Sequence, residues 1–169
     1  PQRLGKNDMD HVYNNTVYNC TVSDNFPSSY GCIGINGSTG ADLDAVNNIA
    51  LDAQDGGDDF QSVGSAGSSN NISSDATAPG ANSQTNTTVT FADATNNDFH
   101  LSPSDTAARN AGTDDIFTDT NLNFLDDIDG TVRGGAVDIG ADEVPVDFTS
   151  IICENTSAGG SCADLDYTT

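Results

Sequence analysis

The chain has 169 residues, of which 26 are acidic and four are basic, and its formal net charge at pH 7 is −22. A charge of this size excludes electrostatic binding to nucleic acid and to anionic membrane surfaces, and no stretch approaches the roughly 20 apolar residues of a membrane span. All but two of the acids are Asp, and strong helix formers are scarce beside abundant Gly, Asn, Ser and Thr, so we expect an all-β fold with little helix.

Pairs of adjacent asparagines recur along the first hundred residues. They are Asn14-Asn15, Asn47-Asn48, Asn70-Asn71 and Asn96-Asn97, separated by 33, 23 and 26 residues. Such a period favours a solenoid, in which each turn is a rung of short strands and the asparagines stack at equivalent corners, hydrogen-bonded along a ladder. Chance is one alternative, because Asn is common in this chain. Disorder is another, because the apolar content is low.

Short clusters of β-branched residues argue against disorder and predict strands. We expect strands at residues 12–22, 32–35, 45–51, 71–73 and 87–91, with loops at 52–67 and 73–88. Short strands with loops between them are typical of solenoid rungs.

The four cysteines form two local pairs, Cys20 with Cys32 and Cys153 with Cys162. We expect two disulfides with this connectivity, although four cysteines allow three connectivities. Metal ligation by thiolates is the alternative, but no CxxC or Cys/His spacing supports zinc. Disulfides imply an oxidising compartment, so we expect an extracellular or cell-surface location. The chain begins at Pro1, and we expect it to be a processed product or a piece of a longer protein.

A series of short motifs occupies residues 91–143. In order they are Asn97-Asp98-Phe99-His100-Leu101-Ser102-Pro103, Ala108-Arg109-Asn110-Ala111-Gly112-Thr113, Asp127-Ile128-Asp129-Gly130 with Arg133, and Val137-Asp138-Ile139-Gly140-Ala141-Asp142-Glu143. This segment resembles the closing part of the right-handed parallel β-helix surface proteins of bacteria called choice-of-anchor Q. It departs from them at Asp105-Thr106, where that family tends to have Ser-Pro.

The resemblance implies an all-β, right-handed parallel β-helix of few rungs at residues 1–100, with a cap-like closing region at 101–144. A small disulfide-closed appendage, or a strand that docks on a neighbouring subunit, is expected at 145–169. Within the closing region, we expect hydrogen bonds of Asp138 and Glu143 to close the last rung, with Arg133 beside them. Gly140 between them is expected to need a positive φ or close packing.

Clustered Asp residues predict calcium as the cofactor, because calcium takes six to eight oxygen ligands from carboxylates and carbonyls. The first candidate cluster is Asp126, Asp127 and Asp129, the second is Asp114, Asp115 and Asp119, and the third is Asp55, Asp58 and Asp59. The alternative for the first cluster is that its Asp residues cap turns and pair with Arg133. For the other two, it is an ordinary solvated loop.

Six Asn-x-Ser/Thr sequences are possible glycosylation sites. They begin at Asn14, Asn19, Asn36, Asn71, Asn86 and Asn155.

We therefore predict a non-enzymatic, calcium-stabilised structural or adhesive protein. The first rung has no polar cap, so its strand edge would be open. Either more rungs precede it in the native chain, or another subunit stacks there, and the second reading predicts end-to-end self-association into a fibre or surface layer. Glycans are further candidate partners. A carbohydrate-active β-helix protein, either a polysaccharide lyase or a glycan-binding module, is the alternative. A lyase would need a basic residue as catalyst, and the chain offers only Arg3, Lys6, Arg109 and Arg133.

Overall fold

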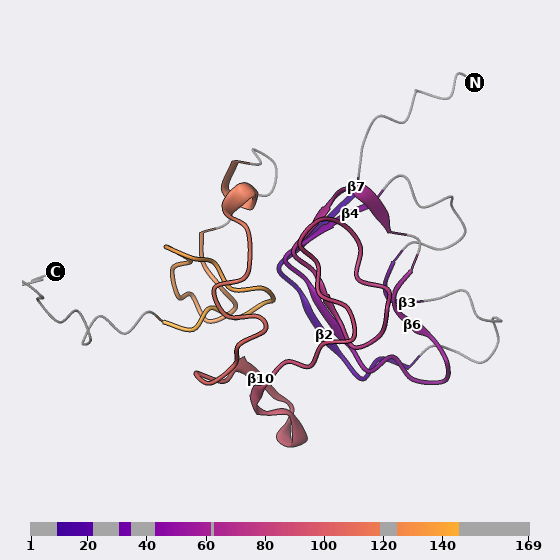
Figure 1. Cartoon of the computed structure of the whole chain (residues 1–169). Helices are drawn as coiled ribbons and strands as arrows, with labels where there is room; N and C mark the ends of the chain where they lie inside the picture. Colours follow the sequence, from indigo (N-terminus) through magenta and orange to yellow (C-terminus); the bar gives the residue numbers. More distant parts are fainter. Residues whose placement is uncertain (1–9, 22–30, 35–42, 62, 119–124, 146–169) are drawn as a thin grey trace, which may run out of the picture.

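The computed structural model describes residues 10–21, 31–34, 43–61, 63–118 and 125–145. These residues form an all-β structure of short, mostly parallel strands with two short 3-10 helices (Figure 1). The elements are β1 (Asp10–Tyr13), β2 (Thr16–Tyr18), β3 (Gly31–Gly34), β4 (Leu43–Val46), β5 (Ile49–Leu51), β6 (Asp58–Gln61), β7 (Gly64–Ser69), β8 (Ile72–Ser73), β9 (Phe91–Asp93), η1 (Ala94–Asn96), β10 (Asp98–Leu101) and η2 (Asp114–Thr118). The prediction of an all-β chain with almost no helix is confirmed.

Consecutive strands of the chain belong in turn to three different parallel sheets. One sheet has the order β1-β4-β7, the second β2-β5-β8, and the third pairs β3 with β6. Each strand therefore pairs with the strand three places further along the chain, and the register places Tyr13 opposite Val46 and Thr16 opposite Ile49. We call β1–β3 the first pass, β4–β6 the second and β7–β8 the third. A short fourth pass, residues 81–84, joins the third through single bridges to Ser69 and Ile72.

The asparagine pairs form the corners between the first two sheets. Asn14, Asn47 and Asn70 have φ angles of 52°, 56° and 52°, a left-handed conformation that Asn adopts more readily than most residues. The chain bends at each of them, so a predicted strand such as residues 12–22 is in fact two strands, β1 and β2. Residues 45–51 are likewise divided between β4 and β5.

The second asparagine of each pair builds the predicted ladder. The Asn15 backbone N–H and side-chain amide donate to Asn48 Oδ1 at 3.0 and 3.1 Å, and those of Asn48 donate to Asn71 Oδ1 at the same two distances. The Asn71 N–H then donates to Ser83 Oγ at 3.0 Å. Asparagine stacking is thus confirmed for three pairs.

The fourth pair, Asn96-Asn97, was wrongly placed in the ladder. Asn97 is the left-handed C-cap of η1, and its N–H donates to the carbonyl of Ala94. The fourth ladder position belongs instead to Asn82-Ser83, where Asn82 has a φ of 57°. A helix cap and a sheet corner both require a left-handed residue, so the same sequence signal serves either structure.

Two strands lie where loops were expected. β6 and the first part of β7 fall in residues 52–67, and they form because they pair with β3 and β4. Conversely, residues 87–90 were expected to be a strand and are not one.

The strand β5 is buried on both faces. Ala50 packs in one cluster with Ile33, Ala45 and Phe60. Its neighbours Ile49 and Leu51 point to the opposite face, because side chains alternate along a strand. There they pack with Ile72, Leu101, Ala108 and Ile139. The second sheet therefore has one core beneath it and another between its outer face and the closing segment, residues 98–145.

The closing segment crosses the passes rather than capping the last one. The Gln84 side chain donates to the Ala107 carbonyl at 2.8 Å, and Asn70 donates to that of Ala111 at 2.8 Å. Asn47 exchanges two hydrogen bonds with the backbone of Thr113, at 2.8 and 2.9 Å. The Ala141 N–H reaches Thr16 Oγ1 at 3.0 Å. The expected cap-like closure is thus corrected: this segment covers a flank and ties all four passes together.

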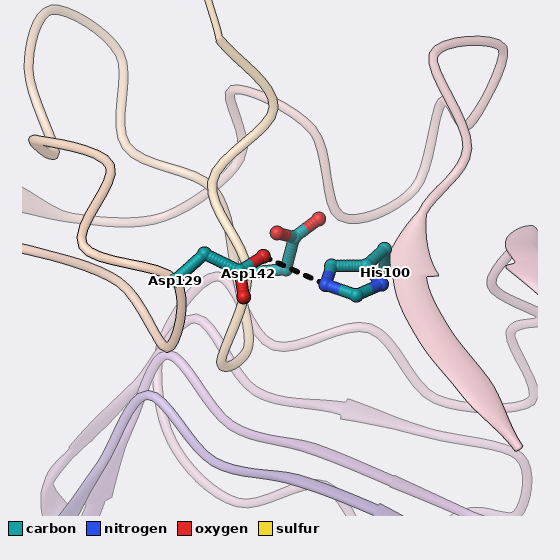
Figure 2. Close-up of side chains that lie close together, drawn as sticks. All are labelled: His100, Asp129 and Asp142. Carbon is teal, nitrogen blue, oxygen red and sulfur yellow. Dashed lines mark hydrogen bonds and ion pairs between the residues drawn. The ribbon is translucent and has the colours of Figure 1, made fainter.

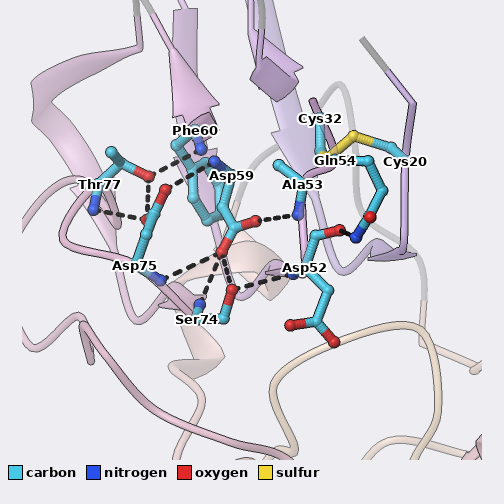
Figure 3. Close-up of a disulfide and its surroundings, with 10 residues drawn as sticks. All are labelled: Cys20, Cys32, Asp52, Ala53, Gln54, Asp59, Phe60, Ser74, Asp75 and Thr77. Atoms are coloured by element: carbon cyan, nitrogen blue, oxygen red, sulfur yellow. Dashed lines mark hydrogen bonds between the residues drawn. A yellow bond between two sulfur atoms is a disulfide. The ribbon is translucent and has the colours of Figure 1, made fainter. Parts of the chain in front are cut away.

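The predicted disulfide between Cys20 and Cys32 is present, with a Cα–Cα distance of 5.7 Å (Figure 3). It joins the turn after β2 to β3 across a sequence separation of 12 residues. For a loop of this length, cross-linking stabilises the folded state by about 3 kcal/mol. Cys153 and Cys162 lie outside the described residues, as does the rest of the predicted appendage after residue 145. No helix in the described ranges is long and apolar enough to cross a membrane.

Candidate functional site

The closing segment is organised around a buried arginine. Arg133 is 3% exposed, and its guanidinium donates to the carbonyls of Gly140 and Ala141 at 3.0 and 2.7 Å. It also lies 3.3 Å from Glu143 Oε2. Burial lowers the pKa of Arg133 and raises that of Glu143, so their mutual attraction is what keeps both groups charged away from water.

Carboxylates of the same segment hold its backbone. Asp127 accepts the N–H groups of Asp129, Thr131 and Glu143 at 2.7 to 3.0 Å. Asp138 accepts those of Asn110 and Val144 at 2.6 and 2.7 Å. These contacts fold the two halves of the segment onto each other.

Gly140 has both properties expected from the sequence. Its φ is +103°, and an added Cβ would lie 2.6 Å from Ile49 Cδ1 and 2.7 Å from Thr16 Oγ1. Its N–H donates to the Asn47 carbonyl at 2.9 Å. Gly140 therefore joins the closing segment to the first two passes, whereas Arg133, Asp138 and Glu143 bond within the segment itself.

A histidine lies at the edge of this network, between carboxylates (Figure 2). His100 Nε2 is 2.7 Å from Asp129 Oδ2, and Nδ1 contacts Asp98 Oδ1. The hydrogen bond to Asp98, and then the one to Asp129, raise the pKa of His100 to about 8. Ligand atoms of His100, Asp129 and Asp142 lie within 4.8 Å of one another, and the described part of the chain holds no other group of three or more metal-binding side chains this close.

The three predicted calcium clusters do not converge in this way. Asp127 directs both carboxylate oxygens at backbone N–H groups, as the turn-capping alternative expected, and Asp126 is exposed. Asp129 pairs with His100 instead of its predicted neighbours. The ligand set Asp126, Asp127 and Asp129 is therefore wrong, because the backbone of the turn consumes Asp127.

In the third cluster, Asp59 is 1% exposed and accepts hydrogen bonds from Ala53, Ser74 and Asp75, which leaves it no role at a surface ion site (Figure 3). Asp55 lies in an exposed turn and Asp58 begins β6. In the second cluster, Asp114 and Asp115 are exposed in the first turn of η2, and Asp119 lies outside the described residues.

The two ends of the asparagine ladder carry unused hydrogen-bonding groups. Each internal asparagine accepts the N–H of the preceding pass, but Asn15 Oδ1 accepts no hydrogen bond from any described residue. At the other end, the Ser83 N–H donates to no described residue. Asn14 is 6% exposed and neither atom of its amide has a partner among these residues, whereas the equivalent Asn47 and Asn70 are bonded to the closing segment.

No protein-family model, curated protein or solved structure matches this chain. The resemblance of residues 91–143 to choice-of-anchor Q proteins stays a prediction, and the geometry alone must support any function.

The possible glycosylation sites divide by burial. Asn14 and Asn71 are buried at the corners, so a glycan does not fit on either, and these two predictions are wrong. Asn19 and Asn86 are exposed. Asn36 and Asn155 lie outside the described residues.

Two members of the histidine group were not predicted as site residues. His100 and Asp142 were named only as members of two motifs, the one from Asn97 to Pro103 and the one around Gly140. Their shared signal was their place in two neighbouring motifs of one segment, but only the fold shows that these motifs meet.

Proposed function

We propose that the chain is an extracellular structural protein whose passes form a short right-handed parallel β-helix, and that copies of it stack end to end. The observation that carries the proposal is the complementarity of the two ladder ends. One end presents an acceptor without a donor, at Asn15 Oδ1, and the other presents a donor without an acceptor, at the Ser83 N–H.

The direction of the ladder makes a second copy the fitting occupant. In every internal step, the N–H of one pass donates to the side-chain oxygen of the next pass. If Asn15 of a second copy follows Ser83, the Ser83 N–H meets Asn15 Oδ1 in the same sense. β1 and β2 are the outer strands of their sheets among the described residues, and such a contact would extend both parallel sheets at the same time. Such a contact is head to tail and does not close, so it would generate a filament.

The position of the closing segment supports this arrangement. It lies along the flank, where it bonds to Asn47, Asn70 and Gln84. A true end cap would have to cover Asn15 or Ser83, and the described part of the segment makes no hydrogen bond with either. Among the described residues, both ladder ends are thus left for pairing.

Charge sets the conditions for assembly. Subunits with a net charge of −22 repel one another, and cations or salt would be needed to screen that repulsion. Calcium, which binds exposed carboxylate and carbonyl oxygens, is the cation we propose for this role. The Cys20–Cys32 disulfide supports an extracellular location, where disulfides persist and calcium is plentiful.

The lyase alternative loses its best catalytic base. Arg133 is buried and committed to Glu143 and to backbone carbonyls, so it cannot reach a polysaccharide. Arg109 donates to the carbonyl of Pro103 at the surface. A non-enzymatic role is therefore the better supported one.

The test is the assembly state of the full chain. We expect negative-stain microscopy and light scattering to show linear polymers at about 1 M NaCl, where the screening length is about 3 Å, and at lower salt with millimolar calcium. Asn15→Lys places a charged side chain on the open end and should leave monomers. A wild-type chain that stays monomeric under both conditions contradicts the proposal.

Gln54→Lys is the matched control. It adds the same charge at an exposed position of the second pass, away from both ladder ends, and should assemble like the wild type. Equal assembly of the Asn15 and Gln54 variants would show that polymers form through another surface. Because Asn15 is exposed, far-UV circular dichroism of its variant should stay that of the folded monomer.

A further inference from the structure

The imidazole of His100 has a carboxylate at each ring nitrogen. Asp98, two residues earlier on β10, contacts Nδ1, and Asp129, from the turn after residue 126, lies 2.7 Å from Nε2. A carboxylate on one nitrogen of a histidine fixes the proton there and turns the lone pair of the other nitrogen outward. In His100 that other nitrogen is Nε2, which donates a hydrogen bond to Asp129 in the metal-free structure, so a bound metal ion would take the place of the Nε2 proton.

Asp142 supplies the third carboxylate in a fixed orientation. It is 7% exposed, and its Oδ2 accepts the Leu101 N–H at 2.7 Å. Its Oδ1 has no hydrogen-bond partner among the described residues. That oxygen is not among the fully buried atoms of the described residues, so it stays open to solvent and to an ion. The nearby ligand atoms are those of His100 and Asp129.

We propose that His100 Nε2, Asp129 and Asp142 bind one divalent transition-metal cation of the zinc class, and that Asp98 positions the histidine. A nitrogen ligand favours such an ion over calcium or magnesium, which take oxygen ligands. Three protein ligands leave a fourth position of a tetrahedral ion for water or for a group from a partner. The proposal is independent of end-to-end stacking, because none of these residues belongs to the ladder.

The required adjustment falls on His100 and Asp129. Zinc bonds of about 2.0 to 2.1 Å in a tetrahedron separate neighbouring ligand atoms by about 3.3 Å, so the 2.7 Å contact between His100 and Asp129 must open by a few tenths of an ångström. The side chains of His100 and Asp129 are 49% and 56% exposed, which leaves both free to make this movement. Because the three ligand atoms lie within 4.8 Å of one another, His100 and Asp129 must also close on Asp142, by up to about 1.5 Å.

Bound metal would connect three parts of the closing segment. His100 comes from β10, Asp129 from the turn that Asp127 organises, and Asp142 from the strand-like stretch beside Gly140. The same three parts are otherwise joined by backbone hydrogen bonds and by the Arg133 network.

Isothermal titration of the full, untagged chain with zinc chloride tests the proposal, with disulfides intact and any free thiols alkylated. We expect one equivalent to bind, and we expect His100→Ala and Asp129→Asn each to weaken binding at least tenfold. A hundredfold excess of calcium should leave zinc bound. Binding that His100→Ala leaves unchanged, displacement of zinc by calcium, or no binding at all would overturn it.

Two substitutions serve as controls. His11→Ala removes the other histidine, which lies exposed on β1, and Asp126→Asn removes an exposed acid three residues from Asp129. Both should keep the wild-type affinity, and a tenfold loss in either would show nonspecific binding. Asp98→Asn should lower affinity by about 10- to 100-fold. With cobalt bound in place of zinc, the Asp98→Asn variant should keep the visible spectrum of the wild type, because the metal ligands themselves are unchanged. An altered spectrum would overturn the positioning role of Asp98.

Discussion

The asparagine corners and the closing segment hold their backbones by opposite chemistries. At the corners, neutral amides of Asn48 and Asn71 are completely buried and repeat the same contacts from pass to pass. In the closing segment, charged groups hold the backbone, and each contact around Arg133 and Asp127 occurs only once. A neutral, repeated network adds passes without adding buried charge, whereas a charged network depends on every partner being present.

The largest test of this contrast is Arg133→Met. The substitution keeps most of the side-chain volume but leaves Glu143 buried without its counter-charge and two carbonyls without a donor. Breaking a buried pair in this way costs about 3 to 5 kcal/mol, and we expect a loss of that size in urea unfolding. Because the folded state of a typical protein is favoured by only about 5 to 15 kcal/mol, this loss is a large share of the total stability.

Arg109→Met is the control for the loss of one positive charge. The Arg109 guanidinium is bonded to the Pro103 carbonyl and to no described carboxylate, so its replacement should cost less than about 1 kcal/mol. Similar losses for both variants would mean that the closing segment does not depend on a buried ion pair.

Asn48→Ala tests the corners. Asn48 Oδ1 accepts two hydrogen bonds from Asn15, and its Nδ2 donates to the carbonyls of Val12 and Val46 and to Asn71 Oδ1. Leaving several of these groups unpaired inside the protein should cost about 3 kcal/mol in equilibrium unfolding. Asn15→Ala, at the exposed end of the same ladder, should cost about 1 kcal/mol. The corners are not a cooperative ladder if the two losses are equal.

Gly140→Ala tests the contact between the two regions. The new methyl group would need both a positive φ and space now held by Ile49 and Thr16, and we expect a loss of about 2 to 3 kcal/mol. Gly130→Ala isolates the backbone term, because Gly130 has a φ of +85° and nothing within 4 Å of the added Cβ. Its loss should be about 1 kcal/mol, measured by thermal unfolding. Equal losses would show that the close approach at Gly140 contributes nothing.

The same contrast explains how far the sequence predicts this molecule. Corners with the same geometry require the same residue type, so asparagine pairs recur in the sequence. This recurrence predicts the ladder at Asn15, Asn48 and Asn71. The prediction for the fourth ladder position was wrong for two reasons. Asn97 caps a helix, and the ladder position is occupied by a serine, Ser83. The strands β6 and β7 lack the β-branched runs that signal a strand, and their pairing with β3 and β4 decides their conformation.

The candidate site was harder to predict, because its members come from different motifs. Asp129 was predicted to bind a metal ion, calcium, together with its sequence neighbours Asp126 and Asp127. His100 is 29 residues away from it in the chain, and only the folding of the closing segment onto itself brings them together. The need for a glycine at position 140 could be predicted, because a positive φ is a property of the local backbone, but the approach of Ile49 and Thr16 could not.

The smallest expected effect concerns Asp75, a carboxylate in the turn after β8. Burial alone would raise the pKa of this carboxyl, but hydrogen bonds from Thr77 and from the Asp59 N–H outweigh it and lower the pKa below 3.8. A lowered folded-state pKa contributes stability that is present above the unfolded value and is lost as the pH falls through the folded value.

We therefore expect the wild type to lose more stability than Asp75→Asn between about pH 5 and pH 3, by at most about 1 kcal/mol because the group is partly solvated. Urea unfolding at several pH values measures this difference. Asp115→Asn removes an exposed carboxylate that accepts no hydrogen bond from a described residue, and its curve should run parallel to that of the wild type. If the Asp75 curve also runs parallel, the hydrogen bonds of this carboxylate do not stabilise its charged form.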